Sequence, residues 1–257
     1  MPDSPLPRTP EGEAVASMEG AEAYDRMNHA EVNRRFVDDV LAACRDEPAG
    51  DPPGSLKDRL RDGLNPLRVL DVGTGTGRIP IELGRRPLFV RVTLTDASEG
   101  MLARARKNVF ASGLHGGMRL ERADARGLPF EDGASGTDGG GPAGFGAVMS
   151  NSLLHHLETP EDLTAALAEM ARVLEPGGLL FLRDLRRPGS ADEVDRLVER
   201  HAAGEDAAGR ELLRASLHAA FTAGELTDAL AAAGAGWARA GETGDRHVTL
   251  VGVKPLG

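Results

Sequence analysis

Short apolar runs alternate with amphipathic segments through the middle of the chain. Runs rich in Val, Leu and Phe are typical of buried parallel strands, and we place strands at residues 69–72, 89–95, 119–123, 145–150 and 179–182. Residues at helical spacing lie between them, at 79–86, 98–109 and 159–173. Strands that alternate with helices predict an α/β fold with a doubly wound, Rossmann-like parallel sheet.

The last third of the chain has a different pattern. Residues 191–220 have helical spacing, and residues 222–225 form a capping box that opens another helix, which ends at Gly234. Residues 237–240 and 247–253 flank a run rich in Gly and Asp. This arrangement predicts an antiparallel hairpin at the C-terminal side of the sheet.

Composition divides the chain into three parts. Residues 1–20 are rich in Pro and poor in large apolar residues, so we expect a disordered tail. Residues 21–65 form a helical N-terminal cap, and residues 66–257 form the ligand-binding domain, with a helical substrate cap at about 185–235. A glycine-rich insertion at 131–144 is expected to be flexible.

Charge and cysteine content restrict the class of protein. The net charge of −10 over 257 residues disfavours nucleic-acid or anionic-membrane surfaces, so we expect no such partner. A single cysteine, Cys44, forms no internal disulfide, and no apolar run approaches the ~20 residues of a membrane span. The N-terminal residues lack the apolar core of a signal peptide. These features favour a cytoplasmic protein.

A glycine-rich turn follows the first strand. Gly73, Gly75 and Gly77 allow a sharp turn and a close approach of the backbone to a ligand. The next helix begins near Arg78, so its free N–H groups face the same place. The turn predicts a nucleotide-like ligand.

Three of the strands end on aspartates: Asp71, Asp96 and Asp124. Ligands of doubly wound sheets bind outside the carboxyl ends of the strands. Taken alone, any one of these aspartates is better explained as a turn or cap residue. Three of them in register with a glycine loop favour a shared ligand site. Asp96 follows Gly77 by 19 residues, close to the ~20 expected of an acid that binds a ribose diol.

The chain resembles the class I S-adenosylmethionine-dependent methyltransferases. The matching segments occur in the family's order, at residues 69–77, 94–102, 122–125, 150–157 and 172–178. The resemblance implies a seven-stranded, mostly parallel sheet that the C-terminal hairpin completes, with S-adenosylmethionine (SAM) as cofactor. Two departures from the family pattern are Gly146, where an acid is common, and the long insertion at 131–144.

The resemblance also implies residue roles at the methionine end of the cofactor. Asp71 and the loop backbone at Gly73, Gly75 and Gly77 hold the ammonium and carboxylate groups. Asn151 ends the fourth strand beside the sulfonium, where methyl transfer occurs.

At the nucleoside end, the resemblance implies that Asp96 binds the ribose hydroxyls. Ala97 and Met101 give apolar contact to the adenine. Asp124 accepts a hydrogen bond from the adenine amino group, while the N–H of Ala125 donates to the ring.

A nicotinamide dinucleotide is the main rival ligand. Its site needs Gly-x-Gly-x-x-Gly, but the required third position is Thr76 when counted from Gly73, or Arg78 when counted from Gly75. The dinucleotide pattern therefore fails.

Methyl transfer needs alignment more than acid or base catalysis, because the leaving group is already activated. Candidate bases are His155 and His156, although the better explanation is that one of the pair packs against and caps the next segment. Residues 24–28 are similar to a Tyr-Asp-x-Met-Asn segment of the ubiquinone and menaquinone C-methyltransferases. Tyr24 is therefore a candidate lid residue.

Arginines and further histidines suggest two more sites. Arg183, Arg186 and Arg187 follow the fifth strand and either clamp an anionic substrate or form a solvated charged turn. A metal site made of His155, His156, His218 and His247 is conceivable, but these residues lack the sequence spacing of metal ligands. We therefore expect no metal.

We interpret the chain as a methyltransferase that acts on a small molecule. The alternative is a catalytically inactive SAM-binding regulatory or interaction module, which intact cofactor residues do not exclude. A protein or RNA methyltransferase is disfavoured by the acidic charge. The acceptor and the oligomeric state stay open.

Overall fold

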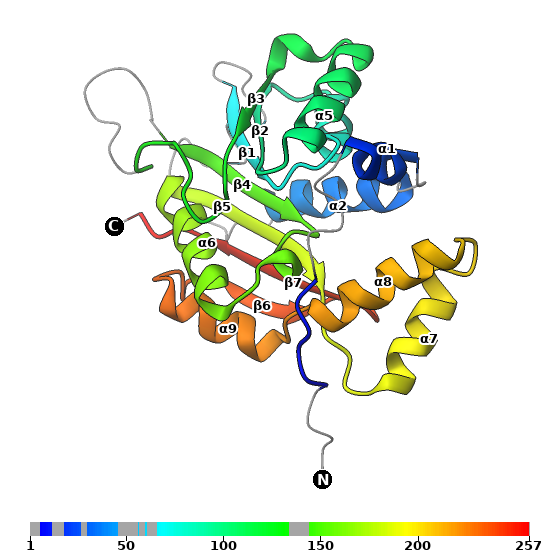
Figure 1. Ribbon diagram of the computed structural model, residues 1–257. Coiled ribbons are helices and arrows are strands. Elements are labelled where there is room, and N and C mark those ends of the chain that lie inside the picture. Colours follow the sequence, from blue (N-terminus) through cyan, green and yellow to red (C-terminus); the bar gives the residue numbers. More distant parts are fainter. Residues whose placement is uncertain are drawn as a thin grey trace.

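Seven strands in the described part of the chain form one mostly parallel sheet (Figure 1). The computed structural model describes residues 6–11, 18–26, 30–45, 56, 60, 66–133 and 144–256. The strands are Leu67–Val72 (β1), Val90–Asp96 (β2), Met118–Arg122 (β3), Phe145–Asn151 (β4), Leu174–Leu185 (β5), Arg239–Glu242 (β6) and His247–Val253 (β7). Their order is β3-β2-β1-β4-β5-β7-β6, and only the pairs that involve β7 are antiparallel. The predicted sheet and terminal hairpin are confirmed.

Helices cover both faces of the sheet (Figure 1). The helices of the described part of the chain are Met18–Arg26 (α1), Ala30–Ala43 (α2), Arg78–Gly84 (α4), Glu99–Ser112 (α5), Pro160–Val173 (α6), Ala191–His201 (α7), Ala207–Ala219 (α8) and Ala223–Ala232 (α9). Helices α7 and α8 pack against each other in a separate apolar cluster. Short 3-10 turns occupy His115–Gly117 (η1) and Leu154–His156 (η2). Buried residues of α2, α4 and α5 share one apolar core with the sheet, while α6 and α9 share the core on the other face. This is the doubly wound arrangement.

Helix starts follow the local chemistry of the sequence. Ser98 caps α5 by accepting a hydrogen bond from the Met101 N–H at 3.2 Å. Capping boxes at Thr159 and Thr222 begin α6 and α9. These caps fix the points where the chain leaves the carboxyl edge of the sheet and turns back along its faces.

Two elements differ from the expected ones. The helical segment at 191–220 is two helices, because Asp206 caps a new start by accepting the Gly209 N–H at 2.9 Å. Strand β5 begins before the Pro-Gly-Gly turn, since Leu174 already pairs with Phe145. The division into tail, cap and ligand-binding domain stays a prediction. Most of the insertion lies outside the described residues.

Residues 6–11 lie within the tail, 1–20, that was expected to be disordered, but specific contacts hold them against the rest of the protein. The Arg8 guanidinium donates to the carbonyl oxygens of Ala219 at 2.7 Å and Glu158 at 2.6 Å, and it lies 3.9 Å from the centre of the Phe221 ring. A proline-rich composition does not reveal such contacts, because a single partly buried guanidinium supplies them. We call residues 6–11 the N-terminal strap. Within the described part of the chain, no helix has both the length and the apolar character needed to cross a membrane.

Gly252 tests how tightly the terminal hairpin fits. A Cβ there would lie 2.6 Å from the Cα of Ala238 and 2.9 Å from the carbonyl oxygen of Trp237. We expect Gly252→Ala to lower the free energy of unfolding by about 1–3 kcal/mol, measured by urea denaturation. The matched control is Gly241→Ala in the partner strand, whose Cβ would meet nothing within 4 Å. Equal stability of the two variants would contradict the close fit.

Candidate active site

One large cavity opens at the carboxyl edge of the sheet. Its volume is about 1270 Å³, more than the ~300–1000 Å³ typical of a single small-ligand pocket. The glycine loop and the ends of β1, β2 and β4 line one part of it, and residues of α1, α2, α8 and the β6–β7 turn line the rest. There is room for two ligands side by side.

The glycine loop follows β1 with three glycines in left-handed backbone conformations. The φ angles are +70° at Gly73, +55° at Gly75 and +75° at Gly77. A Cβ on Gly73 would lie 2.8 Å from Leu153, so glycine keeps the loop close to the chain after β4. Gly77 is not among the residues that line the cavity, and its Cα faces Ala105 of α5. Gly77 was expected to contact the cofactor, but in the structure it lies away from the cavity and lets α5 pack closely against the loop.

Asp71 is a buried acid at the end of β1. Burial raises the pKa of Asp71 to about 7, and the nearby charge of Asp96 acts in the same direction. Within the described residues, no Lys, Arg or His side chain lies within 4 Å of its carboxylate. A buried carboxylate that lacks a cationic partner and lines a cavity suits a ligand that carries a positive charge.

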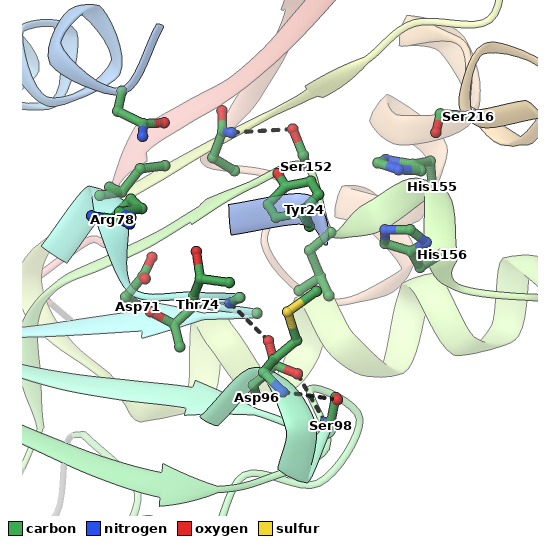
Figure 2. A pocket seen from close by; sticks show the side chains of 18 of the residues that line it. Tyr24, Asp71, Thr74, Arg78, Asp96, Ser98, Ser152, His155, His156 and Ser216 are labelled. Carbon is green, nitrogen blue, oxygen red and sulfur yellow. Dashed lines mark hydrogen bonds between the residues drawn. The ribbon is translucent and has the colours of Figure 1, made fainter. Parts of the chain in front are cut away.

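Asp96 links the end of β2 to the glycine loop. Its two carboxylate oxygens accept the N–H groups of Gly75 and Ser98, each at 2.8 Å (Figure 2). Burial nevertheless raises the pKa of Asp96, against these two hydrogen bonds. Each oxygen keeps further acceptor capacity toward the cavity, which Ala97 and Met101 also line.

Asp124 and Ala125 line the cavity after β3. Arg126 lies in the same turn, and its guanidinium contacts both Asp124 oxygens, at 3.0 and 2.6 Å. These hydrogen bonds lower the pKa of Asp124, and Arg126 also pairs with Asp162 at 2.8 Å. A ligand that contacts Asp124 shares this carboxylate with Arg126, an arrangement that the sequence did not reveal.

The chain bends sharply where β4 ends. Asn151 donates to the Ser152 hydroxyl at 3.1 Å, and Ser152 has a φ of +59°, the one non-glycine residue with positive φ among the described residues. The Ser152 N–H donates to the Arg183 carbonyl at 2.9 Å, which holds the bend against β5. Both Asn151 and Ser152 line the cavity.

His155 is anchored by an acid that sequence reasoning passed over. Its Nδ1 lies 2.6 Å from Asp184, and Asp184 also accepts the N–H groups of Leu154 and Leu185. Burial lowers the pKa of His155, but the charge and hydrogen bond of Asp184 outweigh it, so the pKa is raised. The pair joins η2 to β5. The sequence held one indication of this role, because Asp184 follows the predicted strand at 179–182 as the other site acids follow theirs.

His156 faces the N-terminal strap. Its Nδ1 lies 2.9 Å from a Glu11 oxygen, and the Ser216 hydroxyl donates to the other Glu11 oxygen at 2.5 Å. Burial raises the pKa of Glu11, yet the His156 hydrogen bond and nearby charges leave it lowered. Ligand atoms of Glu11, His155 and His156 lie within 4.8 Å of one another. His218 does not line this cavity, and the expectation of no metal stays a prediction.

Helix α1 covers the glycine loop and is fastened there by Asp25. The Asp25 carboxylate lies 2.7 Å from Arg78 and 2.6 Å from Arg104, and it accepts from Asn108 at 3.0 Å. Burial raises the pKa of Asp25, but the two arginines outweigh it and lower the pKa. This cluster was not found from the sequence, because its members lie far apart in the chain.

The Asp25 cluster places Tyr24 in the cavity wall, with Asp71 on one side of its ring and the two histidines on the other (Figure 2). Burial raises the pKa of Tyr24, and the charge of Asp184 adds to this effect. The Tyr24 hydroxyl is therefore neutral at physiological pH.

The arginines after β5 do not form the expected substrate clamp. Arg183 pairs with Asp39 at 2.8 Å, Arg186 with Glu193 at 2.5 Å and Arg187 with Glu225 at 2.6 Å. None of the three lines the cavity. Each side chain pairs with an acid of a helix, in α2, α7 or α9. These ion pairs neutralise the positive charge that was expected to bind a substrate.

Comparisons with known proteins agree with this geometry. Residues 69–178 match the family model described as a methyltransferase domain. The chain is 31% identical over 219 residues to the malonyl-[acyl-carrier protein] O-methyltransferase of Geobacter sulfurreducens, covering 84% of this chain and 66% of that protein. It is 39% identical over 139 residues to the demethylmenaquinone methyltransferase of Deinococcus radiodurans, covering 53% of this chain and 52% of that one.

The fold is also that of a SAM-dependent methyltransferase from Aquifex aeolicus. The TM-score is 0.59 at 18% identity, with 92% of this chain and 98% of that chain covered. The chain belongs to the class I SAM-dependent methyltransferases, and its cofactor is S-adenosylmethionine. It spans about half to two thirds of the length of the two curated relatives.

The raised pKa of Asp71 predicts that cofactor binding depends on pH. The positive charges of SAM favour ionised Asp71, so affinity should fall as the pH drops through about 7, by up to roughly tenfold per pH unit. Binding at pH 6 should release protons, which calorimetry in buffers of different ionisation enthalpy detects. Asp71→Asn should bind more weakly and lose the proton release, whereas Asp228→Asn on the exposed face of α9 should keep both. Affinity that stays constant between pH 6 and 8 would contradict the role of Asp71.

Proposed function

We propose that this protein transfers the methyl group of SAM to a small molecule bound in the same cavity. One observation carries this conclusion: Asp71, Asp96 and Asp124 from three strand ends line a single cavity with the glycine loop, and the cavity extends beyond them. When bound, SAM supplies a methyl group that its sulfonium already activates. The work left to the protein is to bind, align and exclude water.

Charge and position support the residue roles at the methionine end. Asp71, buried and without a cationic partner in the described residues, binds the ammonium group. The backbone of Gly73 and Gly75, in left-handed conformations, lies close to the methionine carboxylate of SAM. Asn151 ends β4 in the middle of the cavity edge, where the methyl group faces the acceptor. Tyr24 covers this point from α1 and limits access of water.

At the nucleoside end, Asp96 accepts hydrogen bonds from the ribose hydroxyls. Ala97 and Met101 contact the adenine ring, and both line the cavity. The Ala125 N–H and Asp124 bind the ring edge, with Asp124 keeping part of its pairing with Arg126. Gly77 is not part of this set, because it supports α5 instead.

We propose His156 as the general base, with an acceptor that carries a hydroxyl group. The support is positional: His156 is 44% exposed at its side chain and lines the cavity, whereas His155 is 5% exposed and bound to Asp184. Glu11 holds Nδ1 of His156, which leaves Nε2 to take the hydroxyl proton. A carboxylate acceptor, already ionised, needs no such base.

The relatives support catalysis over an inactive binding module. Both curated relatives are named as methyltransferases, one of a malonyl-acyl-carrier protein and one of demethylmenaquinone. We also propose a cytoplasmic setting without nucleic-acid partners, which the net charge of −10 and the single cysteine support.

Cofactor binding provides the first test. SAM should bind in calorimetry and NAD should not. Asp96→Ala should raise the dissociation constant for SAM at least tenfold, because a carboxylate that accepts two hydroxyls makes charge-assisted hydrogen bonds worth about 1.5–3 kcal/mol each. The control, Asp228→Ala on α9, should bind as the unmodified protein does. Thermal unfolding of each variant verifies the fold. Binding of NAD in place of SAM would refute the proposed function.

The base assignment predicts a defect in the chemical step alone. With the best acceptor from a panel of hydroxylated small molecules, His156→Gln should lower kcat by roughly 10²–10⁴ and leave the affinity for SAM unchanged. The defect should shrink as the pH approaches the acceptor's own pKa, because the hydroxyl then ionises without help. Glu11→Gln should have a smaller effect, since it only orients the ring. A pH-independent loss in His156→Gln would show that the residue is structural.

A further inference from the structure

Arg246 in the β6–β7 turn lines the cavity with a guanidinium that has no partner among the described residues. Its side chain is partly buried, yet no carboxylate lies within 4 Å of it and no hydrogen bond joins it to another described group. The other described arginines that are not exposed each have a carboxylate, a carbonyl or an aromatic ring as partner. The charge of Asp245 acts on Arg246 from a distance, but no carboxylate pairs with it directly. A partly desolvated cation that lacks a direct ion pair suits an anionic ligand.

Asp245, the acid next to Arg246 in the chain, is already paired with two other side chains. The Asp245 carboxylate lies 2.8 Å from both Arg200 and His201. On the other side, burial and the charges of Arg246 and Arg183 lower the pKa of His247 to about 4, so His247 is a neutral hydrogen-bonding group. Arg246 and the neutral imidazole of His247 line the cavity here, together with His201, which is paired with Asp245, and Glu205.

The backbone fixes the position of Arg246. Its carbonyl accepts the Arg186 N–H at 2.9 Å, and His247 pairs in register with Leu185. The backbone of Arg246 is held by strand pairing, unlike that of an arginine on a mobile surface loop. The position of its Cα, from which the side chain extends, is therefore fixed. Little conformational freedom of the turn is lost when a ligand binds.

The sheet sets the distance between this cation and the place of methyl transfer. Strand β5 lies between β4, which ends on Asn151, and β7, which follows Arg246. Two strand spacings amount to about 10 Å. Asn151 is in register with Arg183 and Arg183 with Thr249, so Arg246 also lies three residues further along, which adds about 10 Å in the strand direction. The two backbones are therefore roughly 14 Å apart. Leu185, Leu212 and Leu213 line the cavity as well and offer apolar contact.

We infer that Arg246 binds an anionic group of the methyl acceptor, a carboxylate or a phosphate monoester, on the β7 side of the cavity and away from the methylated atom. This inference rests on the proposed function, since it assigns the acceptor class of the same cavity. The acceptor then has a hydroxyl at one end, an apolar body and an anion at the other. Guanidinium suits this anion because its planar fork donates two parallel hydrogen bonds.

Matched ligands test the inference by binding alone. The protein saturated with S-adenosylhomocysteine is titrated with hydroxyaryl alkanoates of increasing chain length, with the matched primary amides and with the matched phosphate monoesters. Saturation-transfer NMR finds the binders and calorimetry measures them. We expect the best anion to bind at least tenfold more tightly than its amide, and the comparison of carboxylate with phosphate identifies the preferred group.

Variants assign the effect to the residue. Arg246→Gln should remove the preference for the anion, and Arg246→Lys should keep part of it. The control is Arg239→Gln in the same hairpin, which makes the same charge change at an exposed position outside the cavity. It should bind the anion as the unmodified protein does. Affinity for S-adenosylhomocysteine should be the same in all four proteins.

Two outcomes would overturn the inference: a panel in which no anion is preferred over its amide, or a preference that survives in Arg246→Gln. Either outcome leaves the proposed function standing as long as S-adenosylhomocysteine binds. Failure of S-adenosylhomocysteine to bind would instead refute the proposed function, and the anion preference is then measured on the protein alone.

Discussion

The parallel pairing of β1 with β2 and β4 is the constraint on which the rest of the site depends. In this register every loop that follows a strand emerges at one edge, so the buried acid of β1, the acid of β2 and the bend after β4 line a single cavity. Burial at this edge raises the pKa values of Asp71 and Asp96. The same parallel sheet that stabilises the fold thus prepares a site for a cationic cofactor.

The N-terminal residues complete the site from outside the sheet. The strap brings Glu11 to His156, while Asp25 fastens α1 to two arginines beside the glycine loop. Because the Asp25 side chain is almost fully shielded from solvent, its carboxylate needs the two arginines, and removing either would leave a buried charge only partly compensated. Segments without a long apolar core are therefore held by a few buried charges, and these place Tyr24 and Glu11 in the cavity wall.

Arginines illustrate how the tertiary context assigns roles to identical side chains. Arg186 and Arg187 neutralise acids of the covering helices, whereas Arg246 meets no acid within 4 Å in the described residues and faces the cavity. In the sequence, both groups look like charged turns after apolar strands. The partners that distinguish them come from helices α7 and α9, whose positions depend on how the chain folds back over the sheet.

The sequence alone determined the order of strands and helices, the helix caps and the glycine loop with its strand-end acids, because these depend on local periodicity and on neighbouring residues. It identified Asp71, Asp96 and Asn151 at the edge where the structure has them. Only the tertiary structure decided that Gly77 supports α5, that Asp184 holds His155 and that Arg246 faces the cavity. Each of these depends on contacts between residues far apart in the chain, and the pattern along a sequence does not encode such distances.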